Sequence, residues 1–328
     1  MAQQWAERRG TVKRRVYYQN GEEITHKHTL EYFQSLRIPP AWAEVRIARS
    51  KRAKILATGI DKAGRLQYIY NPAFRAKQEE AKFERVLQFA RALPHMRRTV
   101  DKDLRRPTLD YRKVMAGIVG IMDRTYIRIG NETYARDNQS YGLTTLRSKH
   151  TDVEGNTITF DFMGKSGKRH VMRVTDTRLA RIVRQLDQLP GYEVFKYYDE
   201  SGMRRDVKSS DVNAYIKDVM GEEFSAKDFR TWAGTLIASA ELVAAERAES
   251  ERERKKTITS CVKKVARKLG NTPAVARSSY IDPRIIRTFM DGEDLRKVRT
   301  TVSTMRKQKG SEYLSPEERC VLHLLEAA

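Results

Sequence analysis

The segment NTPAVARSSYIDPRII, residues 271–286, holds a single tyrosine, Tyr280, among several arginines. Thr272 is a residue type that caps helix N-termini, and Pro273 suits the first helical position. The segment therefore predicts a short helix that begins beside Asn271, carries the tyrosine about two turns along and ends before the second proline. The tyrosine either fills a core or attacks something negatively charged, and this segment alone leaves both interpretations open.

The charge of the whole chain favours an anionic partner. Its 328 residues include 64 Lys and Arg against 42 Asp and Glu, a formal net charge of +22 that is spread along the sequence. Such a surface repels itself unless a polyanion neutralises it, and nucleic acid is the first candidate. A membrane surface is the weaker alternative, because no long basic helix with an aromatic face stands out.

Cysteine and histidine usage argues against disulfide and metal chemistry. Two cysteines, Cys261 and Cys320, cannot form a disulfide framework, and six scattered histidines lack paired ligand spacing. The first residues are charged where a signal peptide needs an apolar run, and no stretch approaches the ~18 apolar residues of a membrane span. We expect a soluble cytoplasmic protein, associated with the nucleoid if the host is bacterial.

The chain is long enough for two domains, and its patterning changes near residue 79. In residues 1–78 the runs AEVRIA (43–48) and LQYIY (66–70) alternate apolar and polar side chains, which predicts a small strand-rich domain. Residues 79–328 show helical spacing of apolar residues instead, starting with the run from Phe83 to Leu93. The predicted fold class is α+β, with a mainly helical second domain.

One β island interrupts the predicted helices. We expect a three-stranded meander formed by GLTTLRSKH (142–150), TITFDFM (157–163) and HVMRV (170–174), joined by the turns TDVEGN (151–156) and GKSGKR (164–169). Ile158, Phe160 and Phe162 share one face, so the other face is solvated. The second turn is slim enough to enter a nucleic-acid groove and carries Lys165.

Nucleotide and metal motifs are absent. GKSGKR is not a phosphate loop, because Thr159 stands where the loop needs its first glycine and a strand follows. There is no GxGxxG that opens a helix, no HExxH, and no acidic cluster that suggests two metals. Any chemistry is expected to run without ATP or metal.

The remaining candidates are basic side chains. Arg128 is predicted at the end of a buried helix that Gly130 terminates, and Lys227 and Arg230 near the start of a helix capped by Ser225. Cations near a helix N-terminus oppose its dipole, so an anion should compensate them. Each of these residues taken alone is typical of a solvated surface.

Seven segments together resemble type IB DNA topoisomerases of the compact poxviral and bacterial kind. They occur in the family's order and span most of the chain: IPPAW, GRLQYIY, RIGNE, GLTTLRSKH, FDFMGKSGK, KDFRTW and LGNTPAVARSSYIDP. The family's catalytic constellation of Arg, Lys, Arg, His or Asn, and Tyr then falls on Arg128, Lys165, Arg230, Asn271 and Tyr280. Poxviral and eukaryotic members have histidine where Asn271 stands, and an amide can donate a hydrogen bond but cannot transfer a proton.

The resemblance implies that Tyr280 attacks a phosphodiester of double-stranded DNA, forming a 3′-phosphotyrosyl link and a free 5′-hydroxyl. Arginine forks suit the charge of the phosphorane, and an ammonium such as Lys165 can protonate the departing 5′-oxygen. The strand is resealed without ATP, and supercoils relax in between. A monomer is expected, with no cofactor and no required metal.

Five further side chains match or lie beside DNA contacts of this family. Residues 1–78 would close a clamp around DNA through Gln67, Tyr68 and Tyr70, with Tyr134 and Lys227 added from the second domain. Alternation puts Tyr68 and Tyr70 on one face of their strand and Gln67 on the other.

Two other functions remain open on the sequence. A tyrosine recombinase or integrase shares the chemistry and the catalytic fold, but usually has a helical N-terminal domain and an HxxR context for its second arginine. Here Lys227 occupies the first position of that context and the N-terminal third is strand-rich. A non-enzymatic basic DNA-binding protein would fit the composition equally well.

Overall fold

The computed structural model describes residues 4–10, 15–245, 248–293, 295, 297, 300 and 311–327. The chain divides into two compact units, Met1–Lys82 and Phe83–Ala328. The division falls inside helix α2 (Pro72–Asp103), the same helix that contains the predicted boundary at residue 79. Among the described helices, none is long and apolar enough to cross a membrane.

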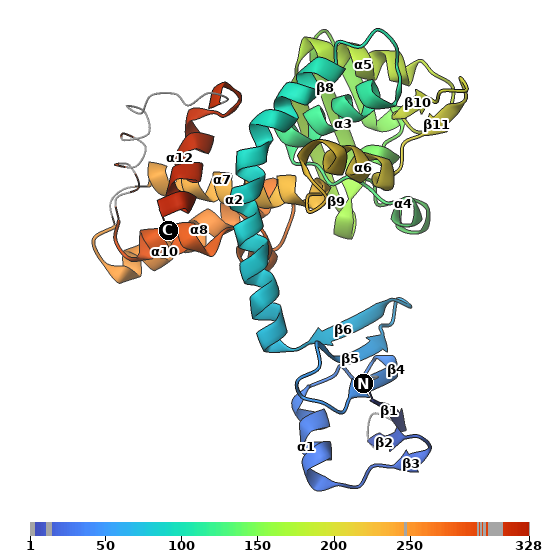
Figure 1. Cartoon of the computed structure of the whole chain (residues 1–328), viewed down its shortest axis with the longest axis vertical. Helices are drawn as coiled ribbons and strands as arrows, with labels where there is room; N and C mark the ends of the chain where they lie inside the picture. The colour runs from blue at the N-terminus through green and yellow to red at the C-terminus, as the bar shows by residue number, and fades with distance from the viewer. Residues whose placement is uncertain are drawn as a thin grey trace. The chain divides into compact units, whose positions relative to one another are not determined.

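The first unit is built on a six-stranded antiparallel sheet with the strand order β3-β2-β1-β4-β5-β6 (Figure 1). The strands are β1 (Trp5–Gly10), β2 (Arg15–Gln19), β3 (Glu22–Glu23), β4 (Ala43–Ala48), β5 (Ile55–Ile60) and β6 (Leu66–Tyr70). The two predicted strands are β4 and β6, which is the edge strand. Helix α1 (Lys27–Ser35) buries Tyr32 and Phe33 in a small core with Val45 and Ile47 of the sheet.

The second unit is mainly helical, as predicted (Figure 1). Its helices, besides the second part of α2, are α3 (Tyr111–Thr125), α4 (Glu132–Asn138), α5 (Thr177–Asp187), α6 (Ser209–Met220), α7 (Ala226–Ala244), α8 (Glu251–Leu269), α9 (Pro273–Ser279), α10 (Pro283–Met290) and α12 (Pro316–Ala327). A short hairpin, β10 (Lys196–Tyr198) and β11 (Arg204–Asp206), lies between α5 and α6 in the sequence.

The meander exists, but its first strand lies elsewhere than predicted. The sheet order is β7-β8-β9, formed by Thr151–Glu154, Thr157–Gly164 and Lys168–Thr175. The segment predicted as the first strand, 142–150, folds instead into two short 3-10 turns, Leu143–Thr145 and Ser148–His150. Local polar bonding explains the difference.

The Thr145 hydroxyl closes the first of these turns. It donates to the Gly142 carbonyl at 3.0 Å and accepts from the Gly142 amide at 3.0 Å. Leu143 and Leu146, three residues apart, are both fully buried, so this segment follows a helical rather than an alternating spacing. The predicted turn 151–156 supplies the first strand because β7 pairs with β8 across the two residues Gly155 and Asn156. The buried face of β8 is as predicted, with Ile158, Phe160 and Phe162 inside.

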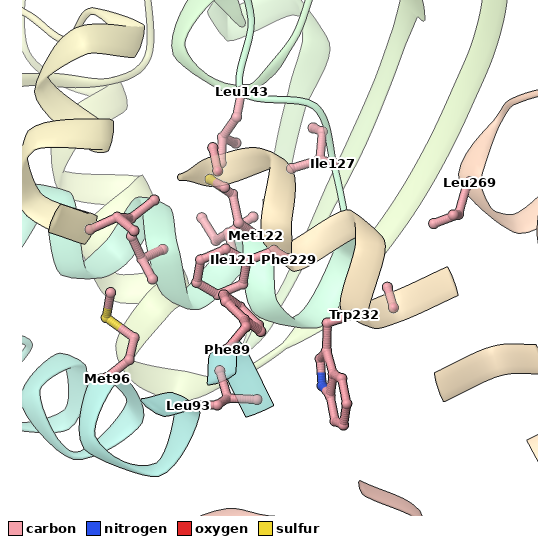
Figure 2. Packing of buried hydrophobic residues seen from close by; sticks show 14 of the residues in the cluster. Phe89, Leu93, Met96, Ile121, Met122, Ile127, Leu143, Phe229, Trp232 and Leu269 are labelled. Atoms are coloured by element: carbon pink, nitrogen blue, oxygen red, sulfur yellow. The ribbon is translucent and has the colours of Figure 1, made fainter. Parts of the chain in front are cut away.

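The core of the second unit includes close sequence neighbours of three predicted catalytic positions. Phe89 of α2 meets Phe229 of α7 edge to face at 4.9 Å between ring centroids, in a cluster that also contains Ile127, Trp232 and Leu269 (Figure 2). Ile127 and Phe229 directly precede positions 128 and 230, and Leu269 lies two residues before position 271. Burial of the neighbours therefore fixes the backbone from which the polar side chains project.

Candidate active site

Arg128 lies in an irregular segment after helix α3 and not at its end. The helix stops at Thr125, and Tyr126 takes the left-handed conformation with φ of 58°. The prediction that Gly130 terminates the helix is therefore wrong. The segment is held instead by backbone bonds from Leu143 and Thr144 to the carbonyls of residues 128 and 129, at 2.8 and 2.7 Å.

Two glycines permit this close approach. A Cβ on Gly142 would lie 2.5 Å from the Gly130 nitrogen and 2.7 Å from the Arg128 carbonyl oxygen. Gly130 itself has φ of 108°, which side-chain-bearing residues rarely adopt. The short path from α3 to α4 thus depends on glycine at both positions, and it sets the direction of the Arg128 side chain.

Helix α7 begins after Ser225, as predicted, and carries Arg230 in its second turn. Asp228 supplies the negative charge that the predicted cations require near the helix N-terminus. Its carboxylate accepts from the Ser225 amide at 2.9 Å and from the Ser225 hydroxyl at 2.8 Å. The compensating anion is therefore part of the protein, and Lys227 remains exposed on the helix surface.

Arg230 is almost completely buried, with 5% of its surface exposed. Its terminal nitrogens donate to the carbonyls of Tyr126 at 2.5 Å and Leu269 at 2.7 Å, while its Nε is buried without a hydrogen-bond partner among the described residues. Burial lowers the pKa of the guanidinium, and the nearby Tyr280 phenol acts in the opposite direction. The site thus holds a buried cation whose Nε donor has no partner among the described residues.

Asn271 links the turn after α8 to Arg128. Gly270 ends the helix with φ of 64°, and the Asn271 Oδ1 accepts a hydrogen bond of 2.5 Å from the Arg128 guanidinium. Because guanidinium only donates, this bond directs the amide nitrogen Nδ2 away, where it is buried and unpaired among the described groups. Helix α9 then starts as predicted, with Thr272 as its cap and Pro273 in its first turn.

Tyr280 directly follows helix α9 as its C-terminal cap and is half-buried against the core. The guanidinium carbon of Arg230 lies 5.2 Å from the centre of its ring, a cation–π contact. On the other side, Thr235 of α7 donates to the Tyr280 carbonyl at 3.4 Å and accepts from the Asp282 amide at 3.0 Å. Helix α7 therefore positions both the buried arginine and the tyrosine.

The two arginines lie close enough to repel each other. Burial first, and then the charge of Arg230, lower the pKa of Arg128 to about 10. Together with the unpaired donors on Arg230 and Asn271, this makes the cluster of Arg128, Arg230, Asn271 and Tyr280 a site that a bound anion would stabilise.

Lys165 does not join this cluster. It lies at the tip between β8 and β9, in the short turn Lys165–Gly167, with its side chain exposed. No residue that the structure describes bonds to its ammonium group. Lys168, at the other end of the same tip, donates to the Asn271 carbonyl at 3.4 Å. The structure brings four of the five predicted catalytic residues together and leaves the fifth in solvent.

No sequence motif pointed to His170, which lies against the cluster. Its ring stacks on Phe162 at 5.5 Å between centroids, and it faces Gly270 directly. Burial lowers the pKa of its imidazole, followed by the charges of Arg128, Arg230 and Lys168. Alternation along β9 could have placed His170 on the inner face, but nothing local indicates a contact with residue 270.

The predicted DNA contacts are mostly exposed. Tyr68 and Tyr70 on edge strand β6 are 43% and 44% exposed and stack on each other at 5.8 Å, whereas Gln67 points the other way and donates to Asp61 at 2.8 Å. This is the alternation that the sequence predicted. Tyr134 lies on the short helix α4 and is 50% exposed.

Both parts of the chain match known protein families. Residues 71–309 match the catalytic core of eukaryotic DNA topoisomerase I, and residues 15–61 match the N-terminal domain of bacterial DNA topoisomerase IB. The chain belongs to the type IB DNA topoisomerase family. As a member of this family it is an enzyme that relaxes DNA, and neither a recombinase nor a passive DNA-binding protein is favoured.

Individual type IB topoisomerases are similar over most of the chain. DNA topoisomerase 1B of Acanthamoeba polyphaga mimivirus is 35% identical over 272 residues, which cover 81% of each protein. DNA topoisomerase 1B of Vaccinia virus (strain Copenhagen) is 23% identical over 300 residues, covering 85% of this chain and 90% of the viral protein. DNA topoisomerase 1 of Mycosarcoma maydis is 26% identical over 249 residues, 24% of its own length.

Proposed function

We propose that Tyr280 cuts one strand of double-stranded DNA by attacking a backbone phosphate, and that the transient break relaxes supercoils. Arg128, Arg230 and Asn271 would bind the non-bridging oxygens of that phosphate, and Lys165 would protonate the departing oxygen. The observation that carries this proposal is the convergence of four segments, 128, 230, 271 and 280, on one cluster with unpaired donors.

The cluster matches the demands of the phosphorane. The transition state places extra negative charge on the non-bridging oxygens, and two arginine forks and an amide can each donate to them. Within the cluster, Arg230 Nε and Asn271 Nδ2 are buried donors with no partner among the described residues. By comparison with other charge-stabilising donors, loss of one such contact costs ~10²-fold in rate.

The covalent step is balanced without an energy source. The Tyr280 hydroxyl releases its proton to solvent water and its oxygen forms a bond to phosphorus. The bond from phosphorus to the 5′-oxygen breaks, and that oxygen takes a proton from Lys165. One phosphoester replaces another, so the reverse attack by the 5′-hydroxyl reseals the strand. We infer that neither ATP nor a metal is required.

Lys165 must reach the phosphate from outside the cluster. Its position on a narrow, exposed turn supports this role, because a hairpin tip is slim enough to enter a DNA groove beside the bound phosphate. An ammonium has a pKa of about 10 and releases a proton far more readily than a guanidinium does.

The exposed tyrosines of the first unit support a DNA clamp. Tyr68 and Tyr70 offer stacked, half-exposed rings on an edge strand, with Lys54 near Phe74 at the end of the same surface. We infer that this face, together with Gln67, Tyr134 and Lys227, contacts duplex DNA. Since one chain supplies all five catalytic candidates, we propose a monomer that acts in the cytoplasm, on the nucleoid if the host is bacterial.

The test is the substitution Tyr280→Phe, which removes only the attacking oxygen. We expect no covalent complex with a nicked or plasmid substrate after denaturation, no relaxation in buffer with EDTA and without ATP, and DNA affinity within about twofold of the wild type. Relaxation at the wild-type rate would refute the assignment.

A further inference from the structure

The ring of His170 fills the space between two glycines that each precede a predicted catalytic residue. A Cβ on Gly164, the neighbour of Lys165, would lie 2.6 Å from the His170 Cδ2 atom. A Cβ on Gly270, the neighbour of Asn271, would lie 2.4 Å from its Cε1 atom. Side-chain carbons do not approach this closely, so the imidazole and both glycines fit together only as they are.

A second contact ties the other end of the hairpin tip to the same place. Lys168 follows the tip directly, and its ammonium group donates to the Asn271 carbonyl at 3.4 Å. The tip Lys165–Gly167 is therefore flanked by Gly164, which packs on His170, and by Lys168, which bonds to Asn271. Because His170 also packs on Gly270, both flanks of the tip are connected to the segment 270–271.

The imidazole is suited to packing and not to carrying charge. Its Nε2 is buried with no hydrogen-bond partner among the described residues. Arg128 and Arg230, from the segment after α3 and from α7, and Lys168 of its own strand surround it, so a proton on the ring would add another positive charge to a cationic site. Among the described residues, the charges that act on the ring are all positive.

We propose that His170 is a positioning residue for Lys165: it wedges between Gly164 and Gly270 and thereby fixes the hairpin tip relative to Asn271. The tip then delivers the ammonium group of Lys165 to the phosphate that the cluster binds. This inference rests on the proposed role of Lys165 as the proton donor to the 5′-oxygen.

The test compares two duplex substrates that differ in one atom of the leaving group. In one the bridging 5′-atom is oxygen, and in the other it is sulfur. A thiol has a pKa of about 8.5, so a thiolate departs without prior protonation and cleavage of the sulfur substrate does not need a proton donor. Single-turnover cleavage rates are measured for the wild type, Lys165→Ala, His170→Ala and the double variant.

We expect His170→Ala to cleave the oxygen substrate at least about tenfold more slowly than the wild type and the sulfur substrate within about threefold of it. The double variant should be no slower than Lys165→Ala, because residues that act through one step are not additive. Met172→Ala is the matched control, since Met172 is the next residue on the same face of β9 and packs on the core. It should leave both rates within about twofold.

Three outcomes would overturn the inference: an unchanged rate for His170→Ala on oxygen, an equal loss on both substrates, or a double variant that is slower than Lys165→Ala by the full factor. If His170→Ala does not fold, Lys168→Ala tests the second contact of the hairpin tip, because Lys168 is exposed and its loss should not disturb folding. This variant must then cleave the oxygen substrate more slowly and the sulfur substrate at nearly the wild-type rate. Failure of the sulfur substrate to restore Lys165→Ala would instead refute the proposed role of Lys165, which separates the two hypotheses.

Discussion

The backbone of Tyr280 lies directly on Gly234, one turn of α7 beyond Arg230. A Cβ at Gly234 would come within 2.3 Å of the Tyr280 carbonyl oxygen and 2.8 Å of the Tyr280 Cβ. The tyrosine can approach the arginine only because this helix position has no side chain. A glycine inside a helix lowers helix stability by about 1 kcal/mol relative to alanine. We infer that glycine stands at position 234 because the contact with Tyr280 needs it.

Gly234→Ala should therefore displace Tyr280 from the cluster. We expect covalent complex formation in single-turnover assays to fall by at least ~10²-fold, since small misplacements of a reacting atom have effects of this size, while DNA affinity changes little. Gly117→Ala is the matched control, because its Cβ would meet only the Ile182 Cγ2 atom at 3.5 Å, an ordinary contact. Equal activity of both variants would contradict this role of Gly234.

A buried ion-pair network is hydrogen-bonded to α7 through Trp232. Arg97 donates to both oxygens of Glu318 at 2.7 Å and to Asp123 at 2.7 and 2.9 Å, and Trp232 donates to Glu318 at 3.2 Å. Burial alone would raise the pKa of Glu318, but the bonds and the charge of Arg97 outweigh it and the pKa is lowered from 4.5. A depressed carboxyl pKa contributes stability above the unfolded value, and this stability is lost as the pH falls through the folded value.

Glu318→Gln should therefore lower Tm at neutral pH, by an amount that reflects a few kcal/mol for a broken buried pair. The difference in Tm between wild type and variant should stay constant from pH 8 to about pH 5 and shrink as the pH falls below about 4.5. Thermal unfolding followed by circular dichroism across this range is the measurement. A difference that grows on acidification would show that the glutamate is not charged in the folded protein.

We expect Arg128 to lower the stability of the folded protein while it contributes to DNA cleavage. Its pKa is lowered from 12.5 to about 10, so the charged form that exists at neutral pH is less favourable in the folded than in the unfolded protein. Arg128→Met should raise the Tm of the DNA-free protein, by on the order of 2 °C, and reduce cleavage at least ~10²-fold. Arg124→Met, which removes a surface pair with Asp176, is the control and should change neither by a comparable amount. A lower Tm for Arg128→Met would refute this expectation.

Salt dependence separates two kinds of predicted DNA contact. If Lys227 binds one phosphate, Lys227→Ala should reduce the slope of log affinity against log salt by about 0.9, because one counterion fewer is released. Tyr68→Ala should lower affinity several-fold and leave the slope unchanged, since the ring carries no charge. Fluorescence anisotropy with a short duplex at several salt concentrations measures both. A reduced slope for Tyr68→Ala would show that the substitution disturbs neighbouring cations.

Local periodicity determined much of the fold. The strands at 43–48 and 66–70, the buried face of β8 and the helix around Phe83 were readable because one face of each element meets a core. Residues 142–150 were misread, because a threonine hydroxyl bonds the backbone locally and overrides the β pattern. The prediction that Gly130 ends the helix before Arg128 was also wrong, because a non-glycine residue, Tyr126, adopts the left-handed conformation that ends α3.

Only the family resemblance predicted which residues form the cluster. The contact between Arg128 and Asn271 spans 143 positions in the sequence, and no periodic pattern encodes such a separation. The same limit hides His170, whose partners are glycines at 164 and 270. The resemblance also named Lys165 without indicating that it stands apart from the other four residues.

The separation of Lys165 from the other four residues bears on which phosphate esters the proposed mechanism would cleave. A small diester held by the arginines alone would meet no proton donor for its leaving group. Duplex DNA is broad enough to engage both the cluster and the hairpin tip. In the proposed mechanism the substrate therefore brings the proton donor and the attacking tyrosine to the same phosphate.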